Sequence, residues 1–87
     1  MLNQKPVYLT KTSNKKIADL FQAKAGRSLF SGYTVHSGVM MNIYENGLVT
    51  DTDGNYLFKL SSIQNVQHIN EIIYINTQNS VYQFSVA

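Results

Sequence analysis

The 87-residue chain has no cysteine, no tryptophan, a single proline and few charged residues. The lack of cysteine excludes disulfide bonds and thiolate zinc sites, and it fits a reducing compartment. The chain also lacks a run of roughly 18 apolar residues, the length that crosses a bilayer, and its first residues lack the apolar core of a signal peptide. We therefore expect a cytoplasmic protein that makes no membrane contact.

The composition predicts one folded domain that spans residues 1–87. Apolar residues make up 44% of the chain and charged residues only 14%, which excludes a disordered, highly charged protein. A chain of this length buries only about 60 to 65% of its unfolded surface, so its own core is modest. A partner protein or a second copy of the chain would add to that burial.

Charge is split unevenly along the sequence. The first 27 residues carry six of the seven cations and one acid, whereas the rest of the chain carries one cation and four acids. The net charge of +2 is too small to indicate nucleic-acid binding by itself. The concentration of cations in one third of the chain indicates a local basic surface instead.

The basic segment contains the one helical pattern in the sequence. Apolar residues recur there at spacings of three and four, residues that favour N-caps precede them, and Gly26 offers a C-terminal stop. The pattern predicts a helix from Asn14 to Ala25 whose narrow apolar stripe covers one side of another element. The stripe consists of Ile17, Leu20 and Phe21.

From Ser28 onward, short apolar segments with a period of two alternate with turn signals, which predicts a series of antiparallel hairpins. The nearly continuous apolar run from Ile72 to Thr77 predicts a central strand covered on both faces. The last segment, Val81 to Val86, is expected to form an edge strand. The whole pattern predicts an α+β fold, in which one N-terminal helix packs on a strongly curved antiparallel β-sheet or small barrel. The turn signals are Asn46-Gly47, Asp53-Gly54, Asn70-Glu71 and Gln78-Asn79-Ser80.

Four motifs follow one another between Asn42 and Phe84. They are IYENGLV at 43–49, LFKLSSIQNV at 57–66, IYINT at 73–77 and YQF at 82–84. Their order resembles that of bacterial pleckstrin-homology-like domains: a glycine-containing hairpin, then a strand that passes from polar residues to isoleucine, then a final strand pair. The resemblance implies a PH-like barrel. Because the expected helix precedes the sheet, as it does in Sm-like and SH3-like barrels, such a barrel is the competing interpretation.

Residue types that support catalysis or metal binding occur without the spacing that such sites need. Residues 51–55 have glycine in the fourth position, whereas a calcium-binding EF-hand loop requires it in the sixth, so they predict a plain Asp-Gly turn. Two histidines, His36 and His68, do not supply the three protein ligands typical of a zinc enzyme. We expect no catalytic residue, no metal and no cofactor.

The basic segment is the candidate binding surface. Lys15 and Lys16 would lie in the first turn of the expected helix, where the helix dipole is positive and each cation costs a few tenths of a kcal/mol. Fold stability does not explain such cations, and phosphates or carboxylates bind where positive charge lies beside unpaired N–H groups. The candidate residues for contact with an acidic partner or nucleic acid are Lys11, Lys15, Lys16, Lys24 and Arg27.

These observations predict a small non-enzymatic binding module that acts through contacts with an acidic protein surface. Modules of this type occur among accessory and inhibitor proteins of bacteria and phages, and we expect this chain to be one. A nucleic-acid-binding small β-barrel that uses the basic segment is the alternative, and a toxin-like ribonuclease with His36 or His68 as acid or base is a weaker one. The expected edge strand from Val81 to Val86 has no charged residue to prevent pairing, so it also predicts a homodimer or a higher homo-oligomer.

Overall fold

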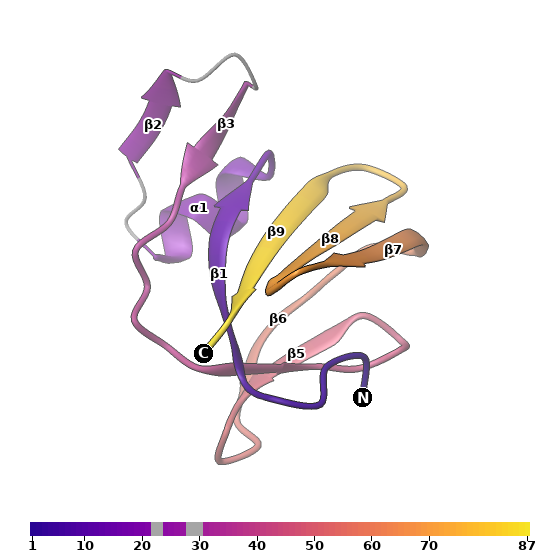
Figure 1. Cartoon of the computed structure of the whole chain (residues 1–87). Coiled ribbons are helices and arrows are strands. Elements are labelled where there is room, and N and C mark those ends of the chain that lie inside the picture. The colour runs from indigo at the N-terminus through magenta and orange to yellow at the C-terminus, as the bar shows by residue number, and fades with distance from the viewer. Residues whose placement is uncertain (22–23, 28–30) are drawn as a thin grey trace.

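The computed structural model describes residues 1–21, 24–27 and 31–87. Within them the chain forms nine strands and one short helix, and the strands join in one antiparallel sheet (Figure 1). The elements are β1 (Val7–Thr12), α1 (Lys15–Leu20), β2 (Lys24–Arg27), β3 (Ser31–Thr34), β4 (Met41–Ile43), β5 (Leu48–Asp51), β6 (Tyr56–Lys59), β7 (Ile63–Ile69), β8 (Ile72–Thr77) and β9 (Val81–Val86).

The predicted α+β fold is therefore wrong, because the domain is almost entirely β-sheet. The helix ends at Leu20 and not at Ala25, and residues 24–27 form strand β2. At the end of α1 the N–H of Phe21 donates to the carbonyl of Ala18 at 3.1 Å, a tight turn that closes the helix. Residues 24–27 instead pair in register with β3, so strand pairing overrides the local helical pattern.

Strand β1 lies at the centre of the sheet, whose main path runs β6-β5-β4-β1-β9-β8-β7. On one side β1 pairs with β9, and on the other side its first residue pairs with β4 and its last two with β3. The predicted edge position of β9 is wrong, because β9 lies between β1 and β8. The strands at the ends of the main path are β6 and β7.

The two end strands of this path are joined by only three residues, 60–62. A flat sheet of seven strands is about 29 Å wide, since neighbouring strands lie about 4.8 Å apart. A link with three residues between its ends spans at most about 14 Å. The sheet must therefore curl until the end of β6 approaches the start of β7, which encloses one of its faces.

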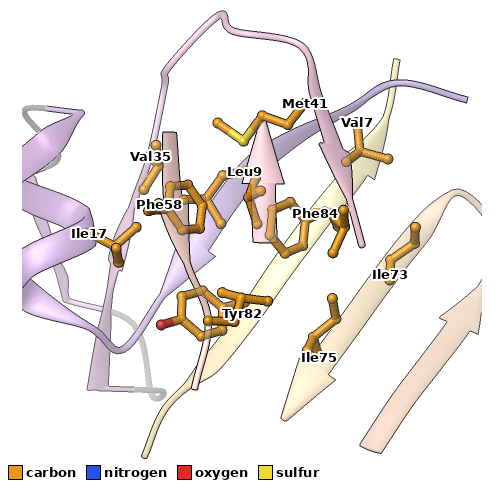
Figure 2. Packing of buried hydrophobic residues seen from close by; sticks show 13 residues of the cluster. Val7, Leu9, Ile17, Val35, Met41, Phe58, Ile73, Ile75, Tyr82 and Phe84 are labelled. Atoms are coloured by element: carbon orange, nitrogen blue, oxygen red, sulfur yellow. The ribbon is translucent and has the colours of Figure 1, made fainter. Parts of the chain in front are cut away.

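The enclosed face holds the hydrophobic core (Figure 2). The ring of Phe58 on β6 lies 6.5 Å from that of Tyr82 on β9, which shows that the two strands face each other across the interior. Phe21, just after α1, packs edge-on against Phe58 at 5.9 Å, so the helix covers one end of the core. Burial of an aromatic ring such as that of Phe84 stabilises the fold by roughly 2 to 3 kcal/mol.

Strand β8 is covered on one face and not on both as its apolar sequence predicted. Ile73, Ile75 and Thr77 are buried, whereas Tyr74 and Asn76 point to the opposite, exposed face. The side chains of one strand alternate between the faces of the sheet. The outer face of β8 therefore presents polar and aromatic groups to solvent.

The predicted hairpin turns are confirmed. The β4–β5 and β5–β6 loops share one geometry, a tight turn closed by a glycine with positive φ: Gly47 at 90° and Gly54 at 89°. Between β7 and β8 the left-handed residue is Asn70, at φ 56°. The two glycines differ in surroundings, because a Cβ on Gly47 would lie 2.7 Å from the carbonyl oxygen of Leu60, whereas one on Gly54 would meet nothing within 4 Å.

We expect Gly54→Ala to lower the free energy of unfolding by about 1 kcal/mol, the cost of a left-handed conformation for a residue with a Cβ. Gly47→Ala should lower it by about 3 kcal/mol, since the added methyl also displaces the backbone at Leu60. Urea denaturation of the two variants measures the difference. Equal losses of unfolding free energy in the two variants would show that a methyl group at position 47 does not disturb the backbone at Leu60.

Candidate functional site

A cleft of about 430 Å³ opens at one end of the sheet, where β1, β3, β8 and β9 come together. Tyr74 and Asn76 of β8 line it, and both alternate with buried core residues, so the cleft involves the face opposite the core. The same wall includes Val81 and Gln83 of β9. The cleft is thus a mainly apolar hollow with hydroxyl and amide groups in its lining, and it lies mostly on the outer side of the curled sheet.

A row of paired residues crosses the cleft from strand to strand. Tyr74 pairs with Gln83, Gln83 with Lys11, and Lys11 with Thr34. Directly paired residues of an antiparallel sheet share a face. Lys11 is therefore held beside tyrosine, amide and hydroxyl groups, and Lys24 of β2 occupies the next register position, opposite Thr34.

A β-bulge in β1 places Lys11 on this face. Leu9 pairs with Phe84 and Lys11 with Gln83, so the two residues from Thr10 to Lys11 stand opposite one residue of β9. With regular alternation Lys11 would face the core like Leu9, but the bulge shifts the alternation by one residue. Lys11 is accordingly exposed, while Thr12 is buried in its place.

Hydrogen bonds hold the rim of the cleft in a fixed position. The hydroxyl of Thr10 donates to the carbonyl of Gln83 at 2.9 Å, beside the bulge. Ser13 binds Val81 twice, because its N–H donates to the carbonyl (3.1 Å) and its Oγ accepts from the N–H (3.0 Å). The side-chain amide of Asn14 donates to the hydroxyl of Tyr82 at 3.0 Å. The walls are therefore formed before any ligand binds.

The electrostatic character of the cleft is positive. Its lining residues, all in the described part of the chain, include one lysine, Lys11, and no acid. Among the described residues the one ion pair lies elsewhere, between the Met1 amino group and Glu45 Oε1 at 3.0 Å, and this hydrogen bond lowers the pKa of Glu45. An anionic group in the cleft would thus meet a cation and hydroxyl groups without a competing carboxylate.

The structure brings together only part of the predicted basic surface. Lys11 lines the cleft, and Lys24 pairs with a cleft residue. Arg27 pairs with Ser31 at the other end of the β2–β3 ladder, and the side chains of both Lys24 and Arg27 lie outside the described residues. Lys15 and Lys16 are exposed on α1 and do not line the cleft.

The start of α1 provides fewer unpaired N–H groups than expected beside Lys15 and Lys16. The Oδ1 atom of Asn14 accepts hydrogen bonds from the N–H groups of Lys16 (2.9 Å) and Ile17 (3.3 Å). A helix of six residues also has few aligned peptide dipoles. The helix start therefore gives little support for anion binding by Lys15 and Lys16, and their involvement in binding stays a prediction.

Sequence reasoning missed the uncharged residues of the cleft, among them Tyr74, Asn76 and Gln83 on its outer face. The alternating pairs Tyr56/Phe58 and Tyr82/Phe84 predict aromatic core positions. This is correct for Phe58, Tyr82 and Phe84, which are buried, and wrong for Tyr56, which is exposed. The available signal was the alternation within residues 72–77, where tyrosine and asparagine interrupt the isoleucines. That pattern is typical of a strand with one solvent-facing side.

The two histidines do not come together. The N–H of Val35 donates to the carbonyl of Thr10, so the segment that carries His36 runs beside β1 on the side away from β9. His68 lies on β7, and strands β1, β9 and β8 separate the two imidazoles. The described residues also contain no group of three His, Asp or Glu side chains that could hold a metal ion.

The chain matches no family model, no curated protein and no solved structure. The resemblance to pleckstrin-homology-like domains therefore stays a prediction. In residues 1–21, 24–27 and 31–87, no helix has the length and apolar character needed to span a bilayer.

The β5–β6 turn is organised by Asp51. Its Oδ1 atom accepts from the N–H groups of Asp53 and Asn55, each at 2.9 Å, and its Oδ2 atom accepts from the side-chain amide of Asn55 at 3.1 Å. These bonds, led by the backbone N–H of Asn55, lower the pKa of the Asp51 carboxyl below its ordinary value of 3.8. The carboxylate therefore serves as a turn cap and confirms the predicted Asp-Gly turn.

We expect the Asp51 carboxyl to titrate below 3.8 in a carbon-detected NMR pH series of the folded protein. Because its folded pKa is lowered, the turn contributes its stability above the pKa of the unfolded carboxyl and loses it as pH falls through the folded pKa. In Asp51→Asn, the fall in unfolding free energy at low pH should therefore be smaller, because residue 51 no longer takes up a proton. A normal titration of Asp51 would contradict the turn geometry.

Proposed function

We propose that the protein is a non-enzymatic binding module that holds an acidic segment of a partner protein in the cleft. The observation that supports this most strongly is the β-bulge that turns Lys11 out of the core and into a preformed hollow. Bulges often re-aim a side chain at a binding site. A lysine needed only for solubility would not require this register shift.

The lining of the cleft favours a short peptide segment as its occupant. The volume of about 430 Å³ lies in the range of small ligand sites and admits a few side chains. Tyr74, on the outer face of β8, offers a large contact surface that loses little conformational entropy on binding. Lys11 supplies the charge that selects a carboxylate, and the amide of Gln83 offers hydrogen bonds beside it.

Nucleic acid fits the same cleft less well. Single-stranded nucleic acids bind in grooves where several cations follow the phosphates and aromatic rings stack on the bases. Tyr74 supplies a ring, but Lys11 is the one cation among the lining residues, all of them described. Four predictions from the sequence remain predictions: nucleic-acid binding, ribonuclease activity, a role as a phage or bacterial accessory or inhibitor protein, and a cytoplasmic location.

We expect Lys11→Glu to weaken binding of a glutamate-rich peptide by about tenfold, since the peptide loses a cation and meets a like charge. The measurement is an NMR titration of the nitrogen-labelled full chain at low salt. In the wild-type protein, the largest shifts should fall on Lys11, Tyr74 and Gln83.

The matched control is Lys59→Glu on β6, which changes the net charge equally at another exposed strand position. It should change the dissociation constant by less than about twofold. Equal weakening by both variants would mean that the peptide follows overall charge and not the cleft. A different result would be that single-stranded oligothymidylate binds at the same residues more tightly than the glutamate-rich peptide, with a steep salt dependence. That result would favour the nucleic-acid alternative over the proposal.

A further inference from the structure

Strand β7 is an exposed end strand with little support from the core. Ile63 is half-buried and the other six residues of the strand are exposed. Val66 pairs with the buried Ile75, so it shares the core face of the sheet, yet 38% of its surface is accessible. On its other edge, β7 has no strand partner among the described residues. Its outward N–H and carbonyl groups are therefore available to pair with another strand.

Apart from a bulge near its start, strand β7 lacks the devices that protect end strands. Natural sheets protect such strands with charges, prolines or short length. Strand β6, at the opposite end of the main path, has four residues and includes Lys59. Strand β7 has seven residues, IQNVQHI, without a charged residue or a proline. Like charges would therefore not oppose the pairing of one copy of β7 with another.

The order of residues in β7 is nearly symmetric about Val66. Polar residues flank it on both sides, with Gln64-Asn65 before it and Gln67-His68 after it. In an antiparallel pair centred on Val66, valine would meet valine, Asn65 would meet Gln67 of the second copy, and Gln64 would meet its His68. Every position thus faces one of its own polarity. A bulge between residues 63 and 65 interrupts the regular register with β8 at Gln64, so the regular part of the strand begins at Asn65.

We infer that two copies of the chain associate through β7, in an antiparallel pair centred on Val66 that joins their sheets into one. A two-fold axis through Val66 makes the interface self-complementary, as symmetric dimers require. The pair of valines would extend each core from Ile75 across the junction, because Val66 lies on the core face. This surface differs from β9, which the sequence indicated and which is internal to the sheet.

The test is sedimentation velocity of the full chain from low micromolar to near-millimolar concentration. Wild-type protein should reach twice its mass of 9.8 kDa. Val66→Lys and Val66→Glu should each weaken the dimer by about tenfold or more, because like charges would face each other at the axis. An equimolar mixture of the two variants should dimerise again. Tyr56→Lys, a lysine on the exposed β6 end strand, is the matched control and should leave the dimer unchanged.

A second variant decides the question if the charged variants do not fold. The chain has no cysteine, so Val66→Cys introduces a single thiol. Facing residues in an antiparallel pair have Cβ atoms about 4.5 to 5.5 Å apart, which is close enough for a disulfide after small adjustments. Mild oxidation should link Val66→Cys chains faster than Tyr56→Cys chains. A wild-type monomer at near-millimolar concentration, a dimer that Val66→Lys leaves intact, or equal cross-linking rates would overturn the inference.

Discussion

The short connection between β6 and β7 is the constraint on which the rest of the structure depends. Three residues join the two end strands of a path seven strands wide. This link is too short to span a flat sheet of that width, so the sheet must curl. Curling brings Phe58 to Tyr82 and creates an interior that a chain of this size can fill. It also divides the molecule into an apolar concave side and a polar convex side, and the cleft involves the second.

The bulge in β1 determines which residues of this strand enter the core and which line the cleft. Strand β1 buries Val7 and Leu9, so with regular alternation the next buried residue would be Lys11. The extra residue avoids this burial, because it moves Lys11 to the convex side at the level where β3 begins to pair with β1. The hydroxyl of Thr10 binds β9 at the irregular position, which helps to keep the two strands together there.

The features that the sequence predicted well are those with local causes. Asn46-Gly47, Asp53-Gly54 and Asn70-Glu71 form turns because their own backbone preferences require it. The end of the helix and the internal position of β9 depend on pairing between distant strands, which no local pattern records. The exposed side of β8 did have a local signal, because tyrosine and asparagine alternate with the isoleucines of residues 72–77. The candidate site shows the same division. The basic residues were visible in the sequence, but their relation to one cleft required a bulge and the register of several strands.

The antiparallel pairing of β1 with β9 also fixes where the chain leaves the domain. Strand β9 begins at the cleft with Val81 and runs away from it for about 17 Å, and the N–H of Ala87 donates to the carbonyl of Pro6 at 2.9 Å. Polypeptide attached after Ala87 would therefore start at the far end of the sheet from the cleft. A surface anchor or a fluorescent protein fused at this point would leave the entrance of the cleft unobstructed, which makes the position after Ala87 suitable for immobilisation.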